Sequence, residues 1–362
     1  MITVGRINDP KLARSIIEKG RADLVSVGRQ QFADIDFGTK TLKGLDDEVR
    51  QCIACDWCTE RLFQGIHVEC AVNYFFTREI EYDEQNLSPA LRKKNVLIIG
   101  GGVAGMEAAR VAGLRGHNVS LIEKSEHLGG LVSSVASQIP RLNTRDLGNI
   151  VNYLSGQLAK IPNVKIELGV EATRESVRKR KPDIVVLATG SLLLIPNIPG
   201  ITAGSNVITL DDYLSKKLSV GENVVIIGGQ NGAEIAVSLA REGKKVTIVE
   251  KTAEIALNPY ITPIASRRSM LIRFIKEEGV NVLKESELKE ITKEVVIVLD
   301  KDKNEFTVKA DTVIIATERQ PNAVLRDELQ GLVEQIYSIG DCVQPRKIFD
   351  AIHEAANIAL KI

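Results

Sequence analysis

The sequence has little of what marks a protein for nucleic acid, membranes or secretion. Its 47 basic residues equal its 47 acidic residues, so no net charge favours a polyanionic partner or an anionic membrane surface. No apolar run approaches the length of a membrane span. The start, from Met1 to Arg6, lacks the basic segment and long apolar core of a signal peptide. We therefore expect a cytoplasmic protein that binds neither nucleic acid nor membrane.

Histidine is scarce, and no histidine is placed for chemistry. The four histidines are His67, His117, His127 and His353. None lies in a metal-like pair or beside a serine or cysteine nucleophile motif, so the sequence assigns no catalytic residue. The length of 362 residues suffices for two or three domains with a sizeable core.

Cysteine is also rare, but four of the five cysteines share one short segment. They follow the spacing Cys52-x2-Cys55-x2-Cys58-x11-Cys70. Three thiolates in one loop can wrap a corner of a cubane and a fourth can close it from a distance, which is how iron–sulfur clusters are held. A structural zinc usually takes two separated Cys-x2-Cys pairs, and four buried free cysteines so close together would be unusual. The spacing predicts a 4Fe–4S cluster in a reducing compartment. The remaining Cys342 is interpreted as a small buried residue, and Trp57, inside the loop, as packing.

Residues 1–29 predict a strand, a helix and a second strand. The first strand ends at Gly5-Arg6 and the second at Gly28-Arg29. Parallel strands that end alike and are joined by one helix are typical of a piece of a β/α barrel, whose last loops commonly hold a phosphate. Glycine lets the backbone approach and arginine supplies a charged fork. The doublet favours a phosphate site over two solvated strand-end charges. Residues 30–50 predict a last helix and a linker.

A first glycine-rich turn follows the buried strand at 96–99. Gly100 permits the tight turn, Gly102 admits a pyrophosphate and Gly105 lets the helix, which is expected to reach about Arg115, pack on the strand. The helix N-terminus adds a favourable partial charge. Glu123 ends the next strand and is placed to accept hydrogen bonds from ribose hydroxyls. The pattern predicts a dinucleotide site.

A second turn, after the strand at 224–227, repeats this pattern less fully. It holds Gly228 and Gly232, but Gln230 replaces the middle glycine and the loop is one residue shorter. Glu250 ends its second strand, which favours NADH over NADPH, although Lys251 beside it weakens that preference. The alternative is a nucleotide-like domain that has lost its ligand, because Gln230 could crowd the pyrophosphate.

Two matched strands indicate how the domains connect. Residues 183–190 and 311–317 read alike, as crossings into and out of an inserted domain. We predict the end of a truncated β/α barrel at 1–50, the four-cysteine loop and a linker at 51–94, a first nucleotide-binding domain at 95–207 and 318–362, and an inserted domain at 208–317.

These pieces, in this order, resemble the C-terminal part of the large NADH:flavin oxidoreductases of the Old Yellow Enzyme superfamily. That group includes 2,4-dienoyl-CoA reductase, 2-enoate reductase and trimethylamine dehydrogenase. The resemblance covers essentially the whole chain, and its end, Ser338-Ile339-Gly340-Asp341-Cys342, looks like the family's second FAD motif. The resemblance implies an α/β fold made of the C-terminal remnant of a β/α barrel, an iron–sulfur loop, and an FAD domain with an inserted NAD-binding Rossmann-like domain.

The resemblance also implies a role for each candidate residue. Gly5, Arg6, Gly28 and Arg29 match the site for the phosphate of flavin mononucleotide (FMN); Cys52, Cys55, Cys58 and Cys70 match the cluster ligands; Gly100, Gly102, Gly105, Glu123 and Asp341 match FAD contacts; and Gly228, Gly232 and Glu250 match the nicotinamide dinucleotide site. Asp341 would accept a hydrogen bond from the ribityl chain, under a helix that contains Ala355-Ala356. Glu318 departs from the family pattern, which has glycine there.

The implied function is an electron relay from NADH to FAD, to the cluster and to FMN, which reduces activated C=C bonds of enoate or dienoyl type. The expected cofactors are FAD, a 4Fe–4S cluster and NADH, with FMN only if the barrel is complete, because only its last two strands are recognised here. Met1 would then be an internal methionine, or the barrel a separate subunit, or the chain an engineered fragment. An amine dehydrogenase of the trimethylamine dehydrogenase type and an incomplete electron-transfer fragment are the alternatives. Neither the substrate nor the oligomeric state follows from the sequence.

Overall fold

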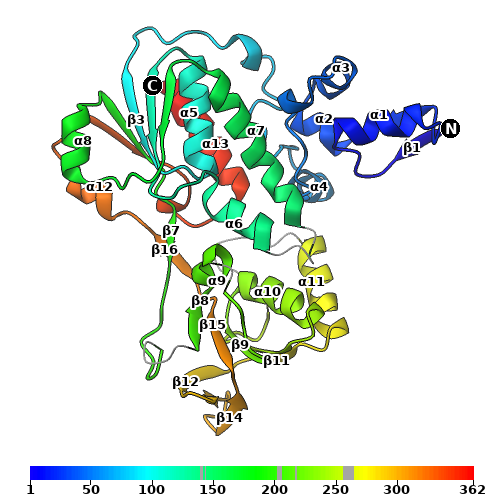
Figure 1. The fold of residues 1–362 in the computed structure, drawn as a ribbon, viewed down its shortest axis with the longest axis vertical. Coiled ribbons are helices and arrows are strands. Elements are labelled where there is room, and N and C mark those ends of the chain that lie inside the picture. Colours follow the sequence, from blue (N-terminus) through cyan, green and yellow to red (C-terminus); the bar gives the residue numbers. More distant parts are fainter. Residues whose placement is uncertain (139–141, 143, 202–205, 217, 256–264) are drawn as a thin grey trace. The chain divides into compact units, whose positions relative to one another are not determined.

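The chain folds into two compact units (Figure 1). The computed structural model describes residues 1–138, 142, 144–201, 206–216, 218–255 and 265–362, without the side chains of Gln138, Lys216, Gln230, Asn231, Ala265 and Ser266. Unit 1 comprises Met1–Ser133, Arg145–Ser191 and Pro321–Ile362, and unit 2 comprises Ser134–Thr144 and Leu192–Gln320. Each unit is described by itself below.

The N-terminal segment of unit 1 is a strand, a helix and a strand, which confirms that prediction. β1 (Ile2–Val4) and β2 (Leu24–Ser26) pair in parallel, and α1 (Pro10–Glu18) joins them. Two short helices, α2 (Arg29–Ala33) and α3 (Phe37–Leu42), follow where we expected one helix and a linker. The break falls at Asp34, whose backbone is extended and whose carboxylate accepts a hydrogen bond from the Asp36 N–H at 3.0 Å. Aspartate competes with helical hydrogen bonding in this way.

The larger sheet of unit 1 is parallel, five-stranded and covered by helices on both faces. Its order is β17-β6-β3-β4-β5, with β3 (Asn95–Ile99), β4 (Asn118–Ile122), β5 (Val164–Glu167), β6 (Ile184–Leu187) and β17 (Gln335–Ser338). In Figure 1, α5 (Val103–Leu114), α7 (Gly148–Lys160) and α13 (Ile348–Lys361) lie on one face, and α8 (Arg174–Arg180) and α12 (Val324–Glu328) on the other. Strand β3 contributes side chains to the hydrophobic cores on both faces of the sheet. Ile98 packs on the side of α5 and Leu97 on the side of α8, because successive side chains of a strand point to opposite faces. Helices α4 (Trp57–Phe63) and α6 (Gly130–Gln138) complete the larger elements.

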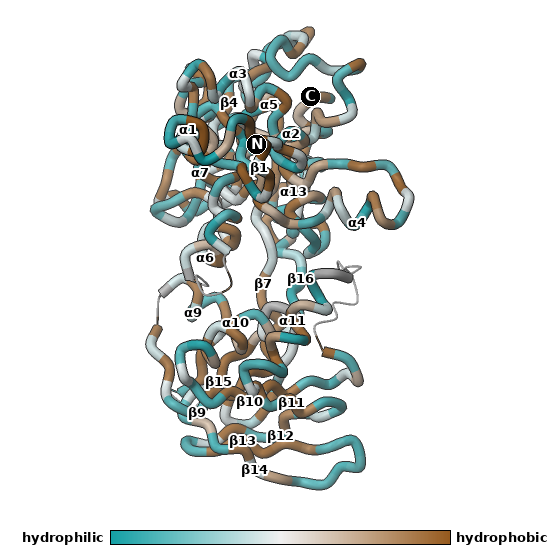
Figure 2. Tube along the Cα trace, turned by 90° about the vertical axis from the view of Figure 1, so that its right-hand side faces the viewer, coloured by the Kyte–Doolittle hydropathy of each residue, from teal (hydrophilic) through white to brown (hydrophobic). Residues whose placement is uncertain are grey.

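Unit 2 repeats the parallel sheet and adds an antiparallel one. The parallel sheet has the order β11-β10-β9-β15-β8 and the antiparallel sheet the order β12-β13-β14. The strands are β8 (Val207–Thr209), β9 (Asn223–Ile227), β10 (Lys245–Val249), β11 (Asn281–Leu283), β12 (Glu287–Ile291), β13 (Val295–Leu299), β14 (Glu305–Lys309) and β15 (Thr312–Ile315); the helices are α9 (Leu210–Lys216), α10 (Gln230–Arg241) and α11 (Ala265–Glu277). Strand β13 is hydrophobic along its whole length (Figure 2) and supplies the buried Val296 and Val298 to this core.

The chain passes from one unit to the other through β7 (Ser191–Leu193) and β16 (Arg319–Pro321), which pair with each other. The sequence predicts an inserted domain at 208–317, whereas unit 2 takes in the longer range Leu192–Gln320. It starts earlier because Leu193, Ile198 and Ile201 pack against the hydrophobic core of unit 2. Among the described residues, no helix has the length and apolar character needed to cross a bilayer.

A buried ionic network ties the N-terminal segment to the helices of unit 1. Arg50 and Arg110 share the carboxylate of Glu84, Arg50 in a short ion pair and Arg110 at 2.8 Å. Arg110 also pairs with Glu107 at 2.8 Å, and the Arg50 guanidinium donates to the Tyr153 hydroxyl at 2.9 Å. Burial by itself would raise the pKa of Glu84, but the two guanidinium groups outweigh it and hold this pKa at about 2.

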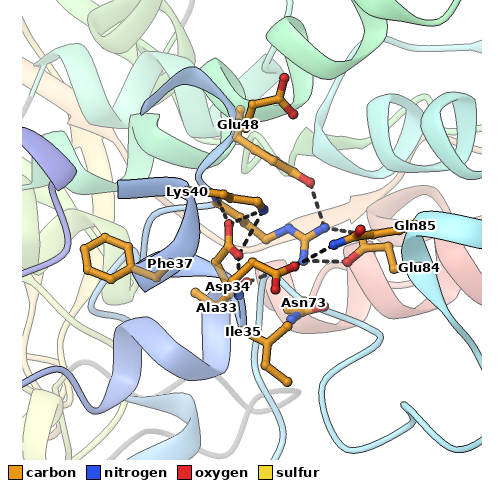
Figure 3. Close-up of polar contacts among 12 residues, drawn as sticks. Ala33, Asp34, Ile35, Phe37, Lys40, Glu48, Asn73, Glu84 and Gln85 are labelled. Carbon is orange, nitrogen blue, oxygen red and sulfur yellow. Dashed lines mark hydrogen bonds and ion pairs between the residues drawn. The ribbon is translucent and has the colours of Figure 1, made fainter. Parts of the chain in front are cut away.

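Asp34 organises the turn beside this network (Figure 3). Its carboxylate accepts hydrogen bonds from Lys40 Nζ at 2.8 Å and from the Arg50 N–H at 2.9 Å. The Gln85 amide reaches across from the linker to the Asp36 carboxylate at 2.6 Å. The short helices after β2 are therefore held to the linker that leads into β3.

Replacing Glu84 with glutamine should destabilise the protein by about 3–5 kcal/mol at neutral pH, because two buried guanidinium groups lose their shared carboxylate. The folded pKa is depressed, so the stabilisation is present above the ordinary value of 4.5 and is lost as the pH falls toward about 2. Urea unfolding at pH 7 and pH 3 should show a smaller difference at pH 3. The control, Glu175→Gln, removes an exposed pair with Arg178 and should leave the urea midpoint almost unchanged, because exposed ion pairs contribute little to stability. Equal losses at both pH values would contradict this account.

Candidate cofactor sites

The first glycine-rich turn is built so that two of its glycines admit no side chain. Gly100 has a φ of +110°, and a Cβ there would lie 2.2 Å from the carbonyl oxygen of Ala188. A Cβ on Gly105 would lie 1.9 Å from the carbonyl oxygen of Gly100. Both contacts are to backbone and cannot be relieved by moving a side chain. Gly100 therefore makes the turn and Gly105 lets α5 approach it, as the sequence pattern predicts.

Gly102 differs from its neighbours because a Cβ there would meet nothing within 4 Å. It is the N-cap of α5, with φ −68° and ψ 174°, and as a glycine it has no side chain that could cap the helix. The first N–H groups of α5 have no partner within the helix, and the helix dipole adds positive partial charge at this end. An open cradle of N–H donors fits the pyrophosphate of a dinucleotide.

Glu123 lies beneath this turn and is held by the protein itself. One carboxylate oxygen accepts the Gly101 N–H at 2.6 Å, and the other accepts the N–H and hydroxyl of Ser125 at 2.8 and 2.9 Å. The acid therefore shapes the turn from the end of β4. Its predicted contact with ribose hydroxyls stays a prediction, and carboxylate lone pairs remain for it.

Asp341 lies at the same edge of the sheet as the first turn. It follows β17, and Gly100 follows β3; both strands flank β6 in a parallel sheet, so their carboxyl ends meet at one edge. The Asp341 carboxylate accepts the Arg346 N–H at 3.1 Å and the Ser191 hydroxyl at 3.3 Å. The fold thus brings together residues far apart in the sequence at the edge where parallel α/β sheets bind ligands.

The second turn copies the first with one residue fewer. Gly229, with φ +81°, shares one feature of Gly100: a Cβ there would lie 2.3 Å from a backbone carbonyl oxygen, that of Ala316. Helix α10 begins directly afterwards, at Gln230, so Gly229 is also the N-cap of α10, the position that Gly102 holds in α5. Gly228 has φ +69°, and a Cβ on Gly232 would meet the Ile226 side chain at 2.9 Å. The side chain of Gln230, expected to crowd the pyrophosphate, lies outside the described side chains.

Glu250 repeats the arrangement of Glu123. One of its oxygens faces the Gly229 N–H at 3.4 Å, and the other accepts the N–H and hydroxyl of Thr252 at 3.0 and 2.9 Å. The acid of each unit therefore supports its own glycine turn through the same pair of contacts. We expect the second turn to hold a dinucleotide less tightly than the first, because its cradle lacks the open glycine.

The four-cysteine loop wraps tightly and keeps all its thiols free. Cys52, Cys55, Cys58 and Cys70 form no disulfide. The loop turns through left-handed backbone at Ala54 and Asp56, with φ of +51° and +60°, and Cys58 lies in the first turn of α4. Burial raises the pKa of all four thiols, to about 12 at Cys55 and Cys70. Iron binding would therefore have to displace protons from these thiols.

A single zinc ion and a 4Fe–4S cubane differ in how their thiolate ligands must be arranged. Among the residues with described side chains, no group of three or more His, Cys, Asp or Glu is gathered closely enough for a single ion. Thiolates around one zinc, with Zn–S bonds of about 2.3 Å, must lie close together. The irons of a cubane occupy separate corners and keep their thiolates farther apart. Four thiols in one loop are the donor set that a cubane requires, and the 4Fe–4S cluster stays a prediction.

Helix α13 packs against the cysteine loop through aromatic side chains. The rings of Trp57 and Phe349 lie with their centroids 4.6 Å apart, and those of Phe349 and His353 3.9 Å apart. A nitrogen of the His353 ring lies 2.9 Å from the Cys70 carbonyl oxygen. The sequence analysis gave His353 no role and interpreted Trp57 as packing. A contact between His353 and Cys70, which lie far apart in the chain, leaves no local signal in the sequence.

The two glycine–arginine ends do not present free arginines. Arg6 forms a short ion pair with Asp146, and Arg29 forms one with Asp56 inside the cysteine loop. Gly5 has φ +133° and no neighbour near a Cβ, and Gly28 is equally open. A phosphate at this site would have to compete with these carboxylates, so the predicted FMN site remains a prediction.

Known proteins share this arrangement. The family described as pyridine nucleotide-disulphide oxidoreductase matches residues 34–148 and 94–359. The cinnamate reductase of Clostridium sporogenes is 36% identical over 364 residues, which cover 100% of this chain and 53% of the relative. The NADH oxidase of Thermoanaerobacter brockii is 36% identical over 369 residues, which cover 100% of this chain and 55% of the relative.

A solved structure agrees with these sequence matches. The structure of a 2-naphthoyl-CoA reductase in complex with 2-naphthoyl-CoA is 30% identical, with a TM-score of 0.90, and the match covers 100% of this chain and 54% of that one. The chain thus spans about half the length of the relatives that it matches.

Proposed function

This chain belongs to the pyridine nucleotide-disulphide oxidoreductase family and matches the C-terminal part of Old Yellow Enzyme-type enoate reductases, and from that premise we propose that it is the NADH-oxidising, electron-transferring part of a flavin and iron–sulfur enzyme. FAD would be held in unit 1, NADH by unit 2, and a 4Fe–4S cluster by Cys52, Cys55, Cys58 and Cys70.

The observation that carries the proposal is that the open glycine cradle and the cysteine loop belong to one compact unit and share α13. That helix follows the Asp341 turn, and its Phe349 packs on Trp57 of the cysteine loop. A flavin and a cluster bound there would be separated by packed protein rather than by solvent. Short, dry separations favour electron transfer between cofactors, and the chemistry itself belongs to the cofactors.

Two parts of unit 1 would bind the flavin cofactor. The Gly102 cradle offers N–H donors to the pyrophosphate, and Asp341 offers a carboxylate oriented by Arg346 and Ser191. Bound FAD would take a hydride from NADH and release single electrons. In unit 2 Glu250 favours an unphosphorylated ribose, hence NADH.

The proposed substrate of the complete enzyme is a small molecule with an activated C=C bond, reduced at FMN in a β/α barrel on this or a separate chain. Residues Gly5, Arg6, Gly28 and Arg29 would contribute to the phosphate site once the barrel encloses the flavin ring. The alternative, an amine dehydrogenase, would run electrons the other way and leave NADH without effect.

The protein carrying FAD and a rebuilt cluster should reduce an artificial acceptor such as ferricyanide with NADH, roughly tenfold faster than with NADPH, a difference of about 1.4 kcal/mol in the barrier. Residues 1–362 alone should not reduce a 2-enoate, because the N-terminal segment contributes the two strands β1 and β2 and these cannot enclose FMN. Anaerobic stopped-flow bleaching of the flavin measures the first step. Failure of NADH to bleach the bound flavin would refute the proposal, and unaided enoate reduction with stoichiometric FMN would refute the need for a further barrel.

A further inference from the structure

Trp57 is the first residue of α4 and lies between two of the cysteines proposed to bind the cluster, Cys55 and Cys58. Three side chains contact its indole ring: the Phe349 ring is tilted by 33° with its centroid 4.6 Å away, Lys347 Nζ lies 4.7 Å from the ring centroid, and the Arg61 guanidinium carbon lies 5.6 Å from it. Three side chains from two elements therefore fix the orientation of this ring.

The edge of the same ring carries an unsatisfied donor. In the described part of the chain two buried side-chain polar atoms have no hydrogen-bond partner, the indole Nε1 of Trp57 and the hydroxyl of Ser238. An indole nitrogen can only donate, so burial without an acceptor is unfavourable and calls for an explanation such as a bound group. The packing of the ring faces does not supply one.

The acceptors expected at this place are sulfur atoms. The loop already directs one donor at a thiol, since the Ala54 N–H donates to the Cys52 sulfur at 3.4 Å; the Thr59 hydroxyl lies 4.0 Å from the Cys58 sulfur, and either of these two groups can donate. The sulfurs of a cluster carry negative charge, and hydrogen bonds to them help to set its reduction potential. A cluster bound by Cys55 and Cys58 would bring such sulfurs next to Trp57.

We propose that the indole N–H of Trp57 donates a hydrogen bond to a sulfur of the cluster and thereby raises its reduction potential. The inference rests on the proposed function, since it needs the cluster. Adding an electron makes the cluster more negative, so a donor stabilises the reduced state more than the oxidised one. Trp57 is then a positioning residue that makes the cluster a better acceptor for electrons from the flavin, and Phe349 of α13 keeps its ring in place.

The chain contains a single tryptophan, which allows a direct test on the unaltered protein. Tryptophan labelled with 15N in the indole ring would label this N–H alone. Pulsed electron paramagnetic resonance of the reduced cluster should show a coupling to that 15N. A cluster without this coupling would overturn the inference and leave the proposed function standing. A protein that binds no iron and sulfide would overturn both.

Two variants test the effect on potential. Trp57→Phe keeps a stacking ring but removes the donor, and the midpoint potential of its cluster should become more negative while iron and sulfide contents stay at wild-type values. Phe349→Leu keeps the donor and removes the stacking partner, so its shift should be smaller. A Trp57→Phe cluster with the wild-type potential would overturn the inference, as would a shift no larger than that of Phe349→Leu.

Discussion

Replacing Gly102 with valine should abolish FAD binding while unit 1 keeps its fold. The backbone at Gly102 has φ −68°, which any residue adopts, and a Cβ there would meet nothing within 4 Å. The valine side chain would instead fill the space in front of the α5 N-terminus, where the pyrophosphate must approach the N–H groups. We expect the FAD dissociation constant to rise at least about a hundredfold, measured by flavin fluorescence titration and by the flavin content of the purified protein.

Two further glycine variants separate binding from folding. Gly38→Val is the matched control, because Gly38 is also open around its Cβ position and lies in α3, apart from the turn; it should keep full flavin content. Gly105→Ala should instead lower the unfolding temperature, since its Cβ would lie 1.9 Å from the Gly100 carbonyl oxygen. A Gly102→Val protein with full flavin content would show that the pyrophosphate does not lie against this cradle.

Replacing Cys58 with alanine should remove the cluster. Iron and acid-labile sulfide should fall from about four of each per chain to near zero, because three remaining thiolates leave one iron without its ligand. The broad visible absorption of anaerobically prepared protein should disappear with them. Flavin content should persist, since Cys58 belongs to the loop and α4 rather than to the glycine turn.

Cys342→Ala is the control for this experiment. Cys342 is a buried free thiol in the same unit, but its sulfur contacts the carbonyl oxygens of Leu187 and Ile339, so its loss should leave iron and sulfide unchanged. Stoichiometric zinc without acid-labile sulfide in the unaltered protein would contradict the cluster. An intact cluster in Cys58→Ala would show that another group serves as its fourth ligand.

The two glycine turns show which structural features a sequence pattern predicts and which it does not. Their spacing predicted the strand, turn and helix of each unit, and the structure confirms these elements. The roles of single glycines depend on tertiary contacts: a Cβ on Gly229 would lie 2.3 Å from the Ala316 carbonyl oxygen, and Gly228 before it has φ +69°. A deletion is visible in a sequence, but which backbone atoms close the gap is not.

The cysteine segment likewise combines a local feature, which the sequence predicts, with contacts to distant residues, which it does not. Its spacing alone predicts a cluster, because ligands within one loop are local in the chain. The partners of the loop are not local: Phe349 and His353 approach it from the end of the chain, and Arg29 pairs with Asp56. The interpretation of both glycine–arginine ends as phosphate sites did not foresee these acids, since ion pairs between distant residues form only when folding brings them together.

By itself, the sequence predicted the strand, glycine turn, helix and second strand of each nucleotide-binding unit, the two matched crossing strands, the cysteine loop and the family. These are written in short-range patterns, because periodicity, turn glycines and ligand spacing act within a few residues. Only the tertiary structure decided that Asp341 shares an edge with Gly100, that Glu84 lies between two buried arginines, and that the Trp57 N–H is left without a partner. Such features depend on burial and on contacts between residues far apart in the chain, and these exist only once the sheets and helices have packed.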